Sequence, residues 1–303
     1  AVGALFYILF REYLSIYTGN WLFWFGLVFM VFVLYARDGL IGIPGQIRRA
    51  LNPPAETGAA MAGRKAGVHP LPTFLKPTDH IEGALLEAKG ISKHFGGLKA
   101  VNNVDITVRD RTLHALIGPN GAGKTTAFNL LSGLYKPDAG GVTLAGQPLS
   151  GRTPEEISAA GIGRSFQITN LFPSLTVQEN IRLAVQAGDA QRMNPLIRAR
   201  KLTEVNDRTA QIMDYAGLSG MEDAEAGSLS YGGQRLLDLG LALGNHPRIL
   251  LADEPLAGLS VAERERIGLL LKALSRDIPV LLVEHDIDRV FELADHVTVM
   301  NEG

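Results

Sequence analysis

The sequence predicts an α/β domain built on a parallel sheet, preceded by an all-α segment that crosses a membrane. Three observations predict this arrangement. Residues 13–36 carry no charge, residues 52–80 hold five of the 15 prolines, and beyond Ile81 apolar runs of strand length alternate with amphipathic helical patterns. Alternation of this kind is typical of a parallel sheet covered by helices. The expected parts are a membrane portion (1–50), a Pro/Gly-rich linker (51–83) and the α/β domain (84–303).

The uncharged residues 13–36 form the expected membrane segment. As a helix these 24 residues span about 36 Å, more than the roughly 30 Å of a bilayer's hydrocarbon core. A buried core helix is the alternative interpretation, and a signal peptide is disfavoured because Arg-Asp-Gly follows the apolar run. Residues 37–66 carry five basic against two acidic residues, so the part that follows is expected on the cytoplasmic side.

The linker and the helix starts have clear local signals. Proline fixes φ and removes a backbone donor, so neither helix nor central strand is expected over 52–80. Helix starts are predicted where Ser or Thr precedes Glu by three residues, at 153–156, 176–179 and 260–263. The chain begins without Met inside apolar sequence and stops just after a predicted strand at 296–300, so we expect truncation at both ends.

The composition excludes several classes of function. Lys plus Arg number 29 and Asp plus Glu number 31 in 303 residues, a net charge of −2. A general nucleic-acid-binding protein usually has a basic excess, so no nucleic acid is expected as a partner. Cysteine is absent, which removes disulfide scaffolds, Cys-ligated metal centres and thiol catalysis.

The strongest motif is a glycine-rich loop that follows an apolar strand, 113–117, and precedes a helical run. It matches G-x-x-x-x-G-K-[ST], and that context is what a phosphate-binding loop requires. Its glycines let successive N–H groups point at phosphate oxygens, and the helix N-terminus adds positive potential. Lys124 is expected to reach the β- and γ-phosphates of a nucleotide, and the Thr125 hydroxyl to bind Mg²⁺. The loop consists of Gly118, Pro119, Asn120, Gly121, Ala122, Gly123, Lys124 and Thr125.

A second motif supplies two carboxylates. The apolar run 249–252 predicts a buried parallel strand, and Asp253 and Glu254 follow it directly. Asp253 at the strand end can hold Mg²⁺, usually through water, and Glu254 can polarise an attacking water. The pair is a weak signal by itself and becomes strong in combination with the glycine-rich loop.

With these motifs, residues 84–303 resemble ATP-binding-cassette (ABC) ATPases of the transporter type. Leu229-Ser-Tyr-Gly-Gly233 stands in the signature position, Gln167 in the Q-loop position and His285 in the switch position. The resemblance implies a P-loop NTPase fold with an antiparallel β subdomain and an α-helical subdomain beside the parallel core. The stretches around Gln167 and over 255–259 look like the branched-chain amino-acid uptake subfamily. The first 50 residues look like the end of its permease, so a permease–ATPase fusion is expected.

The resemblance also implies roles for individual residues. Phe95 would stack on adenine, residues 118–126 including Thr126 would hold the phosphates of ATP, and Gln167 would touch Mg²⁺ or the lytic water. His285 would bond the γ-phosphate, so the expected catalytic set is Glu254, His285, Gln167 and Lys124. Ser230 and Gly232 would contact ATP bound on an opposite cassette, so a second ABC ATPase subunit is an expected partner. The other expected partners are a permease subunit and an extracytoplasmic solute-binding protein, at a bacterial inner membrane with the ATPase on the cytoplasmic side.

Several residues depart from the family pattern: Tyr231, Gly233, Leu236 and Leu241 in and after the signature, and Ser260 in the D-loop. These departures leave nucleotide binding untouched but affect the half-site offered to a partner cassette. A non-transport ABC ATPase, a catalytically impaired regulatory cassette and an exporter therefore stay as alternatives. Branched-chain amino acids are the solute that the resemblance favours, followed by urea or short amides.

Overall fold

The computed structural model describes residues 8, 11–13, 16, 18–20, 22–27, 30, 70–77, 79–165, 171–188 and 202–303. The chain divides into two compact units, Ala1–Glu56 and Thr57–Gly303. Across the described residues, no helix combines the length and the apolar character that a membrane crossing requires. Half of the predicted membrane segment, 13–36, lies outside the described residues, so the segment stays a prediction.

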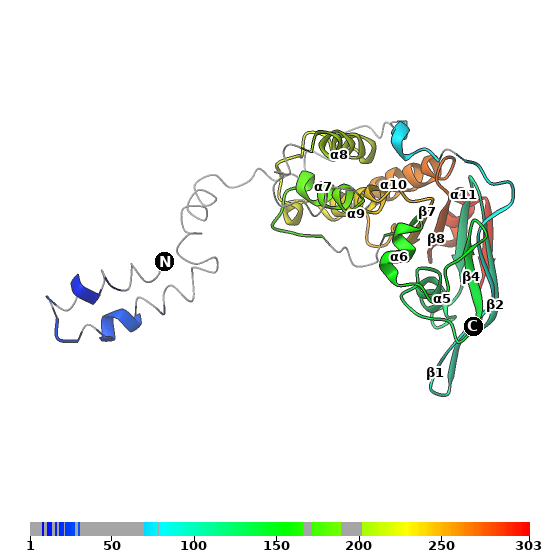
Figure 1. Ribbon diagram of the computed structural model, residues 1–303, viewed down its shortest axis with the longest axis horizontal. Coiled ribbons are helices and arrows are strands. Elements are labelled where there is room, and N and C mark those ends of the chain that lie inside the picture. The colour runs from blue at the N-terminus through cyan, green and yellow to red at the C-terminus, as the bar shows by residue number, and fades with distance from the viewer. Residues whose placement is uncertain are drawn as a thin grey trace. The chain divides into compact units, whose positions relative to one another are not determined.

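The second unit contains two sheets (Figure 1). Antiparallel pairing gives a four-stranded sheet in the order β2-β1-β4-β5. Parallel pairing gives a five-stranded sheet in the order β6-β7-β8-β3-β9. The strands are β1 (Ala84–Phe95), β2 (Leu98–Arg109), β3 (Leu113–Ile117), β4 (Ala139–Leu144), β5 (Gln147–Pro148), β6 (Ile162–Ser165), β7 (Ile249–Asp253), β8 (Val280–Val283) and β9 (His296–Val299).

Helices cover the sheets and form a separate group. Helix α5 contacts strands of both sheets, whereas α7, α8 and α9 pack mainly on one another. The helices are α5 (Lys124–Leu131), α6 (Pro154–Ala159), α7 (Val177–Ala187), α8 (Thr203–Ala216), α9 (Tyr231–Gly244), α10 (Val261–Leu274) and α11 (Ile287–Leu293). All three predicted capping boxes are formed, with Thr153, Thr176 and Ser260 as the N-cap residues.

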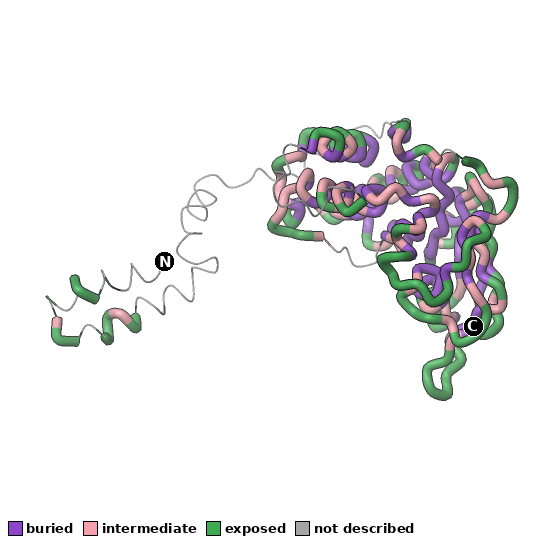
Figure 2. The backbone as a smooth tube through the Cα atoms, in the orientation of Figure 1, coloured by how far each residue is buried: buried purple, intermediate pink, exposed green. Residues whose placement is uncertain are grey.

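The central strands β3, β7 and β8 of the parallel sheet are buried, as Figure 2 shows along the middle of the unit, whereas the edge strand β9 is mostly exposed. In β7, Leu251 faces a core shared with α5 and the antiparallel sheet. Its neighbour Leu250 faces a second core, shared with the helices α7, α8, α9 and α10. Side chains alternate between the two faces of a strand, so continuous apolar runs such as 249–252 fill both cores. The predicted α/β class with a parallel core is therefore confirmed.

The segment before β1 differs from the bare linker expected over 52–80. Thr73–Leu75 forms a one-turn 3₁₀ helix, η1, so the expectation of no helix is wrong at these residues. Leu71 and Leu75 are buried at 7% and 4% exposure in the core of the helical group. The Phe74 ring lies 5.0 Å from the His246 ring and under the guanidinium of Arg208. Apolar burial therefore outweighs the proline-rich local preference here.

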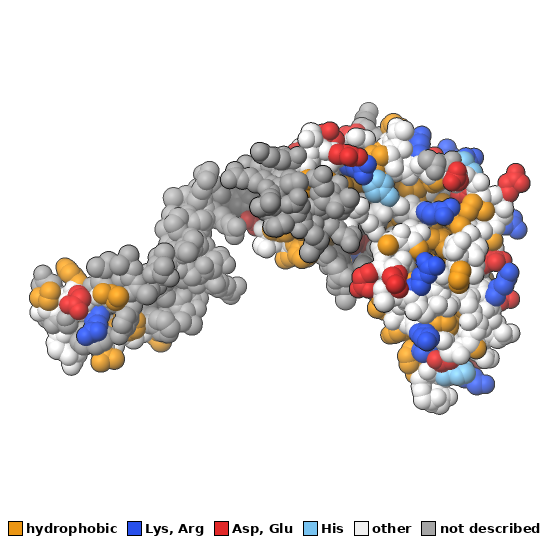
Figure 3. Space-filling model, in the orientation of Figure 1, with side chains coloured by type: hydrophobic (Ala, Val, Ile, Leu, Met, Phe, Trp, Pro, Cys, Tyr) orange, Lys and Arg blue, Asp and Glu red, His pale blue; other side chains and the backbone are white. Residues whose placement is uncertain are grey.

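The face that Figure 3 displays has no large patch of charge of a single sign. Acidic and basic side chains are interspersed over the elements of the second unit. This matches the near-neutral composition of the chain.

Candidate active site

The candidate site lies at one edge of the parallel sheet. Asp253 at the end of β7 pairs in register with Val283 at the end of β8. Val283 in turn pairs with Leu116 of β3. The glycine-rich loop starts two residues beyond Leu116, and His285 lies two residues beyond Val283. Ligands of open α/β sheets bind outside these carboxyl ends, so the register brings the two predicted motifs and His285 to one edge.

The glycine-rich loop has a shape that only glycine permits at two positions. Gly118 and Gly123 have φ values of +153° and +90°. A Cβ on Gly118 would lie 2.2 Å from the backbone oxygen of Met300, and one on Gly123 would lie 2.2 Å from that of Ala100. Side chains cannot approach backbone this closely. Backbone oxygens of β2 and of the residues after β9 therefore pack directly against the loop and leave no room for side chains at Gly118 and Gly123.

The lysine of the loop folds back onto the loop's own backbone. Lys124 is buried at 6% exposure, and its Nζ donates to the carbonyl oxygens of Gly118 at 2.7 Å and Pro119 at 2.9 Å. Helix α5 begins at this residue, with Gly123 as its N-cap, so its unpaired N–H groups face the same loop. Thr125 and residues 119–121 are exposed. The loop thus presents donors and a cation to an anionic ligand.

Asp253 is a buried carboxylate with the environment of a cation ligand. It is 5% exposed, and no hydrogen bond reaches its carboxylate from any residue that the structure describes. Burial raises its pKa, and the charges of Arg164 and Arg235 oppose that rise. Oxygen donors of this kind suit Mg²⁺, which is usually held by one or two carboxylates together with substrate phosphates. The hydroxyl of Thr125 and the carboxylate of Asp253 could hold such an ion.

Glu254 and His285 are in direct contact. The His285 Nε2 lies 2.5 Å from Glu254 Oε1. Glu254 has a φ of +48°, and its backbone N–H donates to the Val283 carbonyl at 2.9 Å. A non-glycine residue with such a φ is strained and is common at active sites. The fold therefore turns this carboxylate towards the switch histidine at the sheet edge.

Phe95 ends β1 with an open aromatic face. It is 45% exposed, its ring lies 5.5 Å from the Tyr135 ring in an edge arrangement, and the Lys93 ammonium lies 5.9 Å from its centroid. An exposed aromatic ring offers a surface on which a planar base can stack. The exposure of the Phe95 ring is compatible with its predicted stacking on adenine.

The signature residues open α9. Ser230 is its N-cap, and its Oγ accepts the N–H of Gly233 at 3.2 Å. Gly232 packs so closely on α10 that an added Cβ would lie 2.2 Å from Glu263 Oε1. Gly232 thus lies beside the start of α10 within this chain. Gln167 lies outside the described residues, so its predicted role is not placed.

Three charged residues near the site were missed by sequence reasoning. Arg164 donates to Ser132 Oγ at 2.6 Å and to Asn129 Oδ1 at 2.7 Å. Arg235 is 4% exposed and donates to the Tyr231 hydroxyl at 2.6 Å. Glu284 is 4% exposed, immediately before His285. Of the three, only Glu284 had a signal in the sequence that could have identified it, because a charged residue there directly follows an apolar run of strand length.

The fold and these residues define a P-loop nucleotide triphosphatase. The profile of the family described as "ABC transporter" matches residues 101–257. The chain belongs to the ATP-binding family of ABC transporters, and as a member of it the chain is an ATPase.

Curated relatives and solved structures agree with this assignment. The chain is 39% identical over 227 residues to the high-affinity branched-chain amino acid transport ATP-binding protein LivG of Salmonella typhimurium, covering 72% of this chain and 89% of that protein. It is 36% identical over 231 residues to BraF of Pseudomonas aeruginosa, with the same coverage. It resembles a nucleotide-free ATP-binding cassette from an ABC transporter with a TM-score of 0.65 and 30% identity, over 73% of this chain and 88% of that one.

Proposed function

We propose that this chain is the ATP-hydrolysing component of an importer for branched-chain amino acids or a similar small solute. The observation that carries the proposal is the 39% identity to LivG across 89% of that protein. Motifs of the phosphate site are common to all ABC ATPases, so they support hydrolysis but not a particular solute. Urea and short amides are the next candidates.

Hydrolysis is assigned to residues at the sheet edge. Lys124 and the N-terminus of α5 hold the phosphates and offset the charge that builds on the transferred group. Glu254 orients the attacking water and draws its proton. His285, whose Nε2 lies 2.5 Å from that carboxylate, is assigned to the γ-phosphate. Thr125 and Asp253 would hold Mg²⁺, which would offset the negative charge of the phosphates. Gln167 and Phe95 are assigned to the water or metal and to adenine, respectively.

Two copies of the cassette are proposed to complete the site. Ser230 caps the N-terminus of α9, and the positive end of a helix suits a phosphate brought by a partner. The proposal draws support from the dimeric structure of the cassette MJ0796, which this chain resembles with a TM-score of 0.62 and 27% identity, over 72% of this chain and 95% of that one. ATP then joins two subunits, and hydrolysis releases them.

A hollow of about 310 Å³ is the proposed contact with a permease. Apolar side chains of α6 and α9, among them Ile157, Leu241 and Ala242, line it, with Arg164 and Asp238 at its polar side. Leu241 stands where the family often has arginine, so this surface is more apolar than expected. The proposal includes a permease subunit and a solute-binding protein as partners. It also includes the membrane segment at 13–36, the fusion to a permease over 1–50 and the cytoplasmic placement of the ATPase.

The function is tested with Glu254→Gln in the full chain assembled with its permease and solute-binding protein. ATP binding should stay at the wild-type level while turnover falls by about 10²-fold or more. Uptake of labelled leucine should fall in parallel. Unchanged hydrolysis would refute the role of Glu254, and hydrolysis stimulated by another solute but not by leucine would refute the proposed substrate. Lys124→Ala should instead weaken ATP binding, measured by nucleotide titration.

A further inference from the structure

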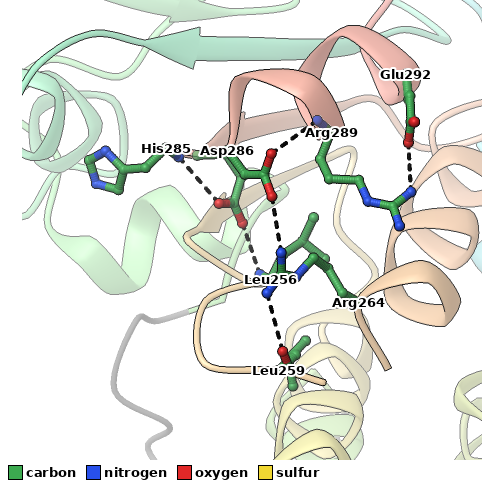
Figure 4. A network of polar contacts seen from close by, with 8 residues as sticks. Leu256, Leu259, Arg264, His285, Asp286, Arg289 and Glu292 are labelled. Carbon is green, nitrogen blue, oxygen red and sulfur yellow. Dashed lines mark hydrogen bonds and ion pairs between the residues drawn. The ribbon is translucent and has the colours of Figure 1, made fainter. Parts of the chain in front are cut away.

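The loop between Glu254 and α10 is tied to both sides of His285. It comprises residues 255–259. Its first end is bonded to Glu284, and its second end is bonded to Arg264, which in turn pairs with Asp286. Glu284 and Asp286 are the neighbours of His285 in sequence. Figure 4 shows this network of polar contacts beside α11. None of these side chains has a part in the mechanism above.

The first tie is the carboxylate of Glu284. Its Oε1 accepts the backbone N–H of Leu256 at 2.8 Å, and its Oε2 accepts the backbone N–H of His285 at 3.3 Å. Glu284 and Leu256 are only 4% and 2% exposed. A buried carboxylate is costly unless hydrogen bonds stabilise it, so its two acceptor oxygens bind both segments where water cannot compete.

The second tie closes the other end of the loop. Arg264 of α10 donates to Asp286 Oδ2 at 3.0 Å and to the Leu259 carbonyl at 3.3 Å. Asp286 is also the N-cap of α11, because its Oδ1 accepts the N–H of Arg289 at 3.3 Å. The loop after Glu254 is therefore held at its start by Glu284 and at its end by Arg264.

We propose that Glu284 is a positioning residue for ATP hydrolysis. Its carboxylate fixes loop 255–259 against His285 and thereby sets the 2.5 Å contact between His285 and Glu254, with the Asp286–Arg264 pair as the second anchor. Misplacing a reacting group by about 1 Å can cost about 10²-fold in rate. Glu284 acts through its neighbours and touches no reacting atom.

The test compares Glu284→Ala with Glu284→Gln in the full chain. Alanine removes both bonds, whereas glutamine can still accept the N–H of Leu256 through its amide oxygen. We expect kcat to fall about 10- to 100-fold in the alanine variant and less in the glutamine variant, with KM for ATP unchanged in both. Amide hydrogen exchange should show lost protection of the Leu256 N–H in the alanine variant and retained protection in the glutamine variant.

Two further variants keep the result decisive. Asp286→Asn weakens the second tie at a partly exposed site, because asparagine has no charge and only one acceptor oxygen for Arg264 and the Arg289 N–H. If Glu284→Ala fails to fold, this variant should still fold and lower kcat without changing KM. Glu292→Gln is the matched control, because it removes an exposed ion pair with Arg289 in the same helix and should leave kcat unchanged. Wild-type kcat in Glu284→Ala, or wild-type kcat in a folded Asp286→Asn, would overturn the proposal. A lower kcat that comes with a lower urea midpoint and a changed KM for ATP would also overturn it, because it would indicate general destabilisation of the cassette.

Discussion

Replacing Leu75 by alanine tests whether the segment before β1 is part of the folded cassette. Leu75 is 4% exposed and packs in the core of the helical group. Replacing a buried leucine by alanine lowers the free energy of unfolding by about 2–5 kcal/mol. Because η1 is a single turn at the surface and can partly collapse into the space, we expect the lower half of that range, about 2–3 kcal/mol.

The assay is thermal unfolding of the full chain, followed by circular dichroism. In a domain of 150–250 residues, 1 kcal/mol shifts Tm by about 2–4 °C, so Leu75→Ala should lower Tm by about 4–12 °C. Thr73→Ala is the matched control, since Thr73 lies exposed in the same turn and should leave Tm within about 1 °C. A Leu75→Ala variant as stable as the wild type would show that this segment is a bare tether.

Three other predictions concern the loop, the metal site and the pH dependence of stability. Gly123→Ala should abolish nucleotide binding in a titration, because its Cβ would meet the Ala100 carbonyl, whereas Gly97→Ala, with open space around it, should bind normally. Asp253→Asn should raise the Mg²⁺ concentration needed for hydrolysis by about 10- to 100-fold while leaving metal-free ATP binding intact; equal Mg²⁺ dependence would contradict the assignment. Burial and the neighbouring His296 lower the pKa of His114 to about 4. Its unfolded pKa is about 6.5, so the unfolded chain binds the proton first, and stability falls as pH drops from 6.5 towards 4. The loss at pH 4 is at most about 3 kcal/mol, reduced by residual solvation, and urea titrations from pH 7 to pH 5 should show a shallower decline for His114→Gln.

The residues that sequence reasoning located share a local signal. The strand before the glycine-rich loop, the helix after it and the three capping boxes all depend on neighbours within about four positions, and the structure forms each of them. The strand ending at Asp253 was equally readable from its apolar run. These features follow from periodicity and from the chemistry of helix ends.

What sequence reasoning missed depends on contacts between distant residues. The burial of Leu75 needs the helical group, which lies more than 100 residues further along the chain. Glu284 reads as one more polar residue after a strand until the fold brings the Leu256 N–H to its carboxylate. The neutral state of His114 likewise depends on burial and on His296 of the paired strand. Tertiary partners of this kind leave no periodic trace in sequence.

The carbonyls that confine the glycine-rich loop impose an order of assembly on the molecule. Ala100 precedes the loop, but Met300 follows β9, and the backbone N–H of Gly303 donates to the Ala122 carbonyl at 3.1 Å. One wall of the loop therefore comes from residues made about 180 positions after it. Closing so large a separation carries an entropic cost that local contacts do not. During synthesis, the loop therefore gains its full set of backbone contacts only after β9 has docked.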